Sequence, residues 1–116
     1  LTPEENLRLV NPKADMKILE DLGLSREESK RNIMHLSGGQ RQRVAVGRAL
    51  VAPGRAILAD EPTGSLDPEM TDEVIDLLRH AAHQLGKCVI VVTHSKRVAD
   101  SADAVYTLRH KKLAKA

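Results

Sequence analysis

The 116-residue sequence is almost devoid of aromatic side chains, with one tyrosine, Tyr106, and no phenylalanine or tryptophan. Its core must therefore be built from Leu, Val, Ile and Ala, which bury less surface per residue than rings do. The single cysteine, Cys88, cannot form an internal disulfide, which is compatible with a reducing compartment. No apolar run approaches the length of a bilayer crossing, so we expect any contact with a membrane to come through a partner.

A strong excess of charge of one sign is also missing. The sequence has 18 Lys and Arg against 16 Asp and Glu, which gives a net charge of +2. This near balance does not favour binding to nucleic acid, and we expect no nucleic-acid partner. Hydrophobic residues make up 41% and charged residues 29%, which is typical of a folded domain and allows one domain but not two in this length.

The first half of the sequence is dominated by helix signals. Thr2 to Glu5 reads as an N-cap, a first-turn proline and two acidic residues at the positive end of a helix dipole. Asn11-Pro12 repeats this opening and predicts a second helix, which stops at Gly23. Ser25 and Glu28 have the spacing of a capping box and predict a short third helix.

The second half changes to a strand and helix pattern. Residues 56–59 and 88–92 are continuous apolar runs without alternation, which is typical of parallel strands buried on both faces. Between them Asp67-Pro68-Glu69 opens an amphipathic helix. A short helix over residues 96–101 and a third strand over residues 104–108 follow. The order predicts an α/β fold in which a parallel sheet is preceded by an α-helical segment.

Two carboxylates, Asp60 and Glu61, follow the first apolar run. In open α/β sheets, ligands bind at the carboxyl edge of the strands. An Asp there can hold Mg²⁺ through oxygen ligands or bound water, and a Glu one residue later can orient or deprotonate an attacking water. A solvated strand end before a turn at residues 62–64 explains the pair equally well.

The segment Leu36-Ser37-Gly38-Gly39-Gln40 precedes a helix predicted over residues 39–52. Adjacent glycines allow close backbone approach to an anion, and the Ser37 hydroxyl, free N–H groups and the helix dipole would converge on a phosphate. An ordinary N-cap, with Ser37 and Gln40 as a capping box, is the better explanation of this segment taken alone.

His94 follows the second apolar run and would emerge at the same sheet edge as Asp60 if the two strands are parallel neighbours. Its ring could donate a hydrogen bond to a phosphate oxygen. A single histidine at a strand end is more often structural or simply exposed, so His94 gains weight only from the other motifs.

Taken together, the order and spacing of these motifs resemble the later half of the ATP-binding cassette (ABC) domain. Leu36 to Gln40 matches the signature sequence of that family, residues 57–62 resemble its Walker B strand with the catalytic glutamate, Ser65-Leu66-Asp67 resembles its D-loop, and His94 resembles its switch histidine. Residues 59–67 look most like the bacterial subgroup that exports antimicrobial peptides, macrolides or lipoproteins.

The resemblance implies a mechanism shared by two ATP-binding domains, which face each other head to tail with ATP and Mg²⁺ between them. It implies that Asp60 holds the metal, that Glu61 acts as base for the hydrolytic water, and that His94 contacts the γ-phosphate. It implies further that the ATP of the partner is bound in trans by Ser37, Gly38, Gly39 and Gln40, and that the D-loop of Ser65, Leu66 and Asp67 couples the two sites.

The same resemblance implies a second ATP-binding domain, as a homodimer or heterodimer, and a membrane permease as partners. The subunit would then lie in the cytoplasm at the inner face of the membrane. A soluble ABC ATPase without a transport role, and a binding module without catalysis that supplies only its signature face, are the alternatives.

A P-loop of the form G-x-x-x-x-G-K-[ST] is absent from the 116 residues, because the one Gly-Lys pair, Gly86-Lys87, is followed by Cys88. We therefore expect a partial P-loop NTPase-like sheet that lacks the Walker A strand. Residues 1–52 are predicted to form a helical subdomain ending in the signature helix, and residues 53–116 the C-terminal part of a RecA-like core. The sequence reads as part of a longer domain that does not hydrolyse ATP alone.

Overall fold

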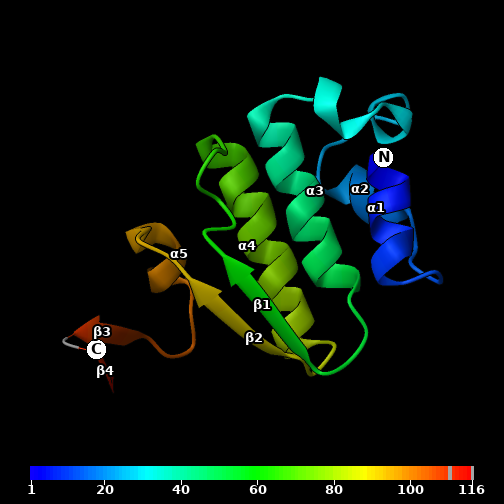
Figure 1. The fold of residues 1–116 in the computed structure, drawn as a ribbon. Helices are drawn as coiled ribbons and strands as arrows, with labels where there is room; N and C mark the ends of the chain where they lie inside the picture. Colours follow the sequence, from blue (N-terminus) through cyan, green and yellow to red (C-terminus); the bar gives the residue numbers. More distant parts are fainter. Residues whose placement is uncertain (110, 116) are drawn as a thin grey trace.

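The computed structural model describes residues 1–109 and 111–115. Helices and strands follow one another as the sequence predicts in outline, with helices first and an alternating pattern afterwards (Figure 1). The elements are α1 (Pro3–Val10), α2 (Lys17–Asp21), the 3₁₀ turns η1 (Glu28–Lys30) and η2 (Ile33–His35), α3 (Gly38–Val51), β1 (Ala56–Asp60), α4 (Pro68–His83), β2 (Cys88–Val92), α5 (Lys96–Asp100), β3 (Tyr106–Arg109) and β4 (Lys112–Lys115).

Strands β1 and β2 pair in parallel and are connected by α4. Ala56 lies opposite Cys88 and Asp60 lies opposite Val92, so both strands end at the same edge. In Figure 1 the two long helices α3 and α4 lie side by side against this pair of strands, and side chains from both helices and from β1 share one core cluster. The predicted α/β arrangement with a parallel sheet is confirmed.

The expectation that both strands are buried on both faces is wrong for the described residues. In β1, Ile57 and Ala59 are buried, whereas Leu58 is 69% exposed. In β2, Ile90 is 52% and Val92 is 51% exposed. The alternation arises because α3 and α4 cover one face of the sheet, and no described segment covers the other. An apolar face of the sheet therefore remains exposed next to the edge where β1 and β2 end.

The third strand starts later than predicted and belongs to a different sheet. β3 begins at Tyr106 and pairs antiparallel with β4, whereas β2 pairs only with β1 among the residues that the structure describes. Lys111 between β3 and β4 has a left-handed backbone, with φ of 63°. The edge of β2 that faces away from β1 is therefore unpaired in the described part of the chain.

The N-termini of the first two helices show which of the predicted helix starts are correct. Thr2 is the predicted N-cap, and it forms a capping box with Glu5, whose N–H donates to Thr2 Oγ1 at 3.1 Å. Asn11-Pro12 does not open a helix, and α2 begins only at Lys17. The Asn11 side chain instead accepts from the Lys13 N–H at 3.0 Å and donates to the Val51 carbonyl at 3.0 Å. Local side-chain bonding of this kind competes with helix formation.

Helix α3 lies between two aliphatic clusters and contributes to both. Val44 packs with residues of the N-terminal helices, and Val46 packs with residues of β1 and α4. Gly47 lets α3 approach its neighbours closely, because a Cβ there would lie 3.1 Å from Leu22 Cδ1 and 3.5 Å from Leu7 Cδ1. This packing fixes the start of α3 relative to the strand edge. No helix among the described residues is long and apolar enough to cross a membrane.

Candidate functional site

The carboxyl edge of the parallel sheet gathers the acidic pair and the histidine. The Glu61 N–H donates to the Val92 carbonyl at 2.7 Å and so extends the ladder one residue past β1. This bond places Glu61 beside Thr93 and His94, which follow β2. The predicted convergence of the two strand ends at one edge is confirmed.

The Glu61 carboxylate is held by three donors from the other strand end. The His94 ring lies with Nδ1 2.6 Å from Glu61 Oε1, and the His94 N–H donates to the same oxygen at 2.9 Å. The Thr93 hydroxyl donates to Oε2 at 3.3 Å. The hydrogen bond from the His94 side chain is the main cause that lowers the pKa of Glu61, and the His94 backbone adds to it. The carboxylate is therefore ionised at neutral pH while its partner ring remains 98% exposed.

The backbone of Glu61 is in the left-handed region, with φ of 45°. A non-glycine residue there costs about 1–3 kcal/mol and persists only where its surroundings hold it. Here the N–H is bound to Val92, the carboxylate to His94, and the carbonyl accepts from the Gln42 side-chain amide. Glu61 is thus fixed at every polar group.

Asp60 is exposed at the end of β1. By the strand alternation it shares the open face of the sheet with Leu58, whereas Ile57 and Ala59 point to the core. Within residues 1–109 and 111–115, no group of three or more His, Cys, Asp or Glu side chains could hold a metal. Asp60 is thus a single exposed carboxylate at the edge that also carries Glu61.

The segment Leu36 to Gln40 forms the capping box that its sequence predicts. Ser37 Oγ accepts from the Gln40 N–H at 3.1 Å, and Gln40 Oε1 accepts from the Ser37 N–H at 2.8 Å. The Gln40 amide also donates to Glu28, so both of its ends are occupied. Gly38 is open, since a Cβ built there meets nothing within 4 Å. Ser37 and Gly38 are both exposed at the start of α3.

The Ser65 to Asp67 loop lies against the start of α3. The Ser65 N–H donates to Gln42 Oε1 at 2.8 Å, and a Cβ at Gly39 would lie 3.2 Å from the Ser65 carbonyl oxygen. Asp67 caps α4 by accepting from the Met70 N–H at 2.8 Å, as its sequence context predicts. The loop of residues 65–67 therefore contacts the start of α3, which carries the glycine pair Gly38 and Gly39.

Gln42 is the residue that sequence reasoning missed. It is half-buried and contacts residues 19 and 23 positions away. Nothing distinguishes it from the polar residues on either side of it, because its contacts depend on how α3 packs on β1. Among the described residues, no hydrogen bond joins Ser37 or Gly38 directly to the sheet edge.

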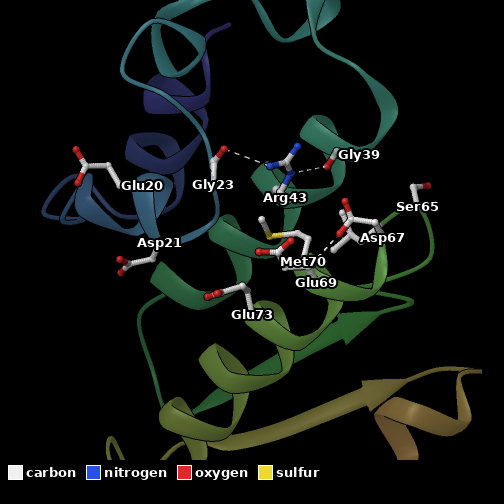
Figure 2. A pocket seen from close by; sticks show the side chains of 11 residues that line it. Glu20, Asp21, Gly23, Gly39, Arg43, Ser65, Asp67, Glu69, Met70 and Glu73 are labelled. Atoms are coloured by element: carbon white, nitrogen blue, oxygen red, sulfur yellow. Dashed lines mark hydrogen bonds between the residues drawn. The ribbon is translucent and has the colours of Figure 1, made fainter.

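A cavity of about 530 Å³ lies next to this loop, between α2, α3 and α4 (Figure 2). Arg43 crosses it, donating to the carbonyls of Gly23 at 3.2 Å and Gly39 at 3.3 Å, as the dashed lines in Figure 2 show. The other charged residues that line it are all acidic: Glu20, Asp21, Asp67, Glu69 and Glu73. Arg43 thereby ties the end of α2 to the start of α3.

A comparison with families of known proteins matches residues 1–64 to the family described as ABC transporter. The chain belongs to the ABC transporter family. As an ABC ATP-binding domain, it is similar to the lipoprotein-releasing system ATP-binding protein LolD of Rickettsia prowazekii (strain Madrid E), with 48% identity over 95 residues that cover 81% of this chain and 42% of the relative. It is also 54% identical over 74 residues to the macrolide export ATP-binding/permease protein MacB of Brucella melitensis, covering 64% of this chain and 11% of that one.

Among solved structures, this ABC domain is similar to the dimeric post-hydrolysis state of the ATP-binding cassette MJ0796 bound to ADP and Pi. The TM-score is 0.86 at 30% identity, and the match covers 99% of this chain and 56% of that chain. The fold is thus that of part of an ABC cassette. The chain spans less than half the length of the lipoprotein-releasing relatives it matches.

Proposed function

We propose that these residues form the signature, Walker B, D-loop and switch portion of an ABC subunit that hydrolyses ATP to drive export through a membrane permease. The observation that carries the proposal is the bond between Glu61 and His94, made by two residues that follow different strands. Relatives named for lipoprotein release and macrolide export support an export role. The proposal places the subunit at the cytoplasmic face of the membrane, held there by the permease.

Glu61 is suited to act on a water molecule. A general base must be unprotonated at the working pH and aimed at the proton that it takes. The lowered pKa keeps the Glu61 carboxylate ionised, and His94 fixes one of its oxygens. In its protonated form the exposed His94 ring has two N–H donors, so it can donate to Glu61 through Nδ1 and to a phosphate oxygen through Nε2. In this proposal Glu61 orients and deprotonates the attacking water while His94 contacts the γ-phosphate.

The signature segment is proposed to bind the nucleotide of a second subunit. Its open Gly38 and the exposed Ser37 lie at the positive end of the 14-residue helix α3, which favours an anion. A solved relative with the same fold is dimeric and holds ADP and Pi. Gln40 contributes by holding the cap, and Ser65, Leu66 and Asp67 connect one subunit to the other.

Asp60 fits the role of a magnesium ligand. Mg²⁺ is bound through one or two carboxylates plus phosphate oxygens and waters, so an isolated exposed carboxylate meets its needs. The ion would neutralise charge that develops on the phosphates during hydrolysis. Asp60 would hold it at the same edge where Glu61 positions the water.

The exposed face of the β1–β2 sheet supports the proposal that further cassette structure packs on this sheet. Leu58, Ile90 and Val92 leave an apolar surface exposed on one side of a two-stranded sheet, and β2 has a free edge in the described part of the chain. Parallel sheets are normally covered on both faces. We propose that residues 1–52 form a helical subdomain ending in the signature helix, that residues 53–116 form the C-terminal part of a RecA-like core without the Walker A strand, and that the chain alone does not hydrolyse ATP.

The test uses phosphate release from ATP. The chain is assayed alone and as a graft that replaces the matching part of the Rickettsia prowazekii relative. We expect no turnover from the chain alone and Mg²⁺-dependent turnover from the graft, abolished by Glu61→Gln but not by Glu73→Gln, an exposed carboxylate on α4. If the isolated chain hydrolyses ATP and Glu61→Gln abolishes that turnover, the proposal that the chain alone is inactive is refuted. A graft that dimerises with ATP but releases no phosphate, with or without Glu61→Gln, would identify a binding module without catalysis.

A further inference from the structure

Gln42 connects the signature helix to the catalytic edge. It lies in the second turn of α3, and its side-chain amide reaches the loop that follows β1. The amide nitrogen donates to the Glu61 carbonyl, and the amide oxygen accepts from the Ser65 N–H at 2.8 Å. Among the described hydrogen bonds, these two are the ones that join α3 to residues 61–65.

The loop lies against the first two turns of α3. A Cβ at Gly39 would lie 3.2 Å from the Ser65 carbonyl oxygen, and one at Gly64 would lie 3.8 Å from Gln42 Oε1. Gln42 itself is half-buried. The loop is therefore seated on the first two turns of α3, and a shift of the helix start must be transmitted to it.

The bond to the Glu61 carbonyl acts on a strained residue. Glu61 has a left-handed φ of 45°, which its surroundings must maintain. Its carboxylate is held from the β2 side by His94, and its carbonyl is held from the α3 side by Gln42. Without Gln42, the Glu61 carbonyl keeps only the Gly64 N–H as a donor, at 3.3 Å. The left-handed backbone of Glu61, and with it the direction of its carboxylate, is then held less firmly, while Asp60 and the signature backbone stay in place.

We infer that Gln42 is a positioning residue that couples the two ATP sites of a dimer. The inference rests on the proposed function, in which the signature segment of one subunit faces one nucleotide and Glu61 of the same subunit faces the other. Gln42 then links, within a single chain, groups that serve two different nucleotides. Occupancy sensed at the start of α3 sets the orientation of Glu61 in the opposite site.

The test uses the active graft described above and measures kcat, KM for ATP and the Hill coefficient. Gln42→Met keeps the length of the side chain and removes both bonds. Gln42→Glu keeps an acceptor for the Ser65 N–H but cannot donate to the Glu61 carbonyl. Gln84→Met, at an exposed position after α4, is the matched control. Thermal unfolding confirms that each variant is folded.

We expect kcat to fall roughly tenfold in Gln42→Met, which loses both hydrogen bonds, and by a smaller factor in Gln42→Glu, which loses only the donor to the Glu61 carbonyl. In both variants KM should change less than about twofold and the Hill coefficient should drop to about 1, because binding is retained and coupling is lost. If Gln42→Met does not fold, Gln42→Glu, which retains the Ser65 contact, decides the outcome.

An unchanged kcat and Hill coefficient in the folded Gln42 variants overturns the inference, as does an equal loss in Gln84→Met or a rise in KM alone. Failure of the proposed function would be seen in a different measurement, the turnover of the unsubstituted graft. If the unsubstituted graft shows no turnover that depends on Glu61, the proposed function itself is wrong.

Discussion

The imidazole Nδ1 of His94 lies 2.6 Å from Oε1 of Glu61, and the His94 N–H donates to the same oxygen at 2.9 Å. One carboxylate oxygen therefore receives two donors from a single residue, 33 positions away in the sequence. Only the ring contact can be removed by a side-chain substitution, so the two contributions are separable by experiment.

Replacing His94 by Ala should raise the pKa of Glu61 toward its ordinary value, but not fully, because the backbone donor remains. A carboxyl with a depressed folded pKa stabilises the protein above its unfolded pKa, and this stability disappears as the pH falls through the folded value. His94→Ala should therefore lose stability at neutral pH and show a smaller acid-dependent loss below the ordinary glutamate pKa.

An NMR titration of the Glu61 carboxyl and urea unfolding at several pH values measure both effects. His80→Ala, at an exposed position on α4, is the control and should leave the titration unchanged. Identical Glu61 titration curves with and without the His94 ring would contradict this account.

The two glycines of the signature segment should differ in their tolerance of alanine. A Cβ at Gly38 meets nothing within 4 Å, whereas one at Gly39 lies 3.2 Å from the Ser65 carbonyl oxygen. Gly38→Ala should be neutral or stabilising because alanine favours the helix. Gly39→Ala should be less stable than Gly38→Ala by about 1–3 kcal/mol, the usual cost of overpacking. Urea unfolding measures the free energy of unfolding of both variants. Equal values would show that the loop at Ser65 moves to accommodate the added methyl group without cost.

Gly23 should tolerate a side chain worse than Gly86 does. Both have positive φ, 77° and 68°, but a Cβ at Gly23 would lie 2.6 Å from the Met70 methyl carbon, and one at Gly86 has open space. Gly86→Ala should lose about 1–2 kcal/mol, the cost of a left-handed backbone alone. Gly23→Ala should lose more, and Met70→Ala in that background should recover the steric part.

A double-mutant cycle on Gly23 and Met70, followed by thermal or urea unfolding, measures the recovery. Strict additivity of the two substitutions would argue against a clash between them.

The ion pair between Arg97 and Asp72 should contribute measurably to the attachment of α5 to α4. It has two contacts, Nε to Oδ1 at 2.9 Å and Nη2 to Oδ2 at 2.6 Å, but both side chains are about half exposed. We expect a coupling free energy of about 0.5–1 kcal/mol that falls as salt is added. The Arg31 and Glu27 pair, with a single contact at 3.3 Å, is the comparison and should couple less strongly. A salt-insensitive cycle at Arg97 would contradict the expectation.

Signals within a few residues predicted the caps and the longer helices. The boxes at Thr2 and Ser37 and the cap at Asp67 are all present, because each bond closes over three residues. Asn11-Pro12 carried the same signal and was wrong, since the Asn11 side chain bonds to the Val51 carbonyl 40 positions away. A tertiary contact overrode the local preference there.

The sequence by itself determined the order of elements, the motifs and the family, because periodicity, capping and motif spacing are local properties of the chain. Only the tertiary structure decided that the sheet is covered on one face, that Glu61 is held by His94, and that Gln42 spans from α3 to Glu61 and Ser65. The physical reason is that these contacts close over 19 to 33 residues. They depend on how α3 and the strands pack, which no local preference specifies.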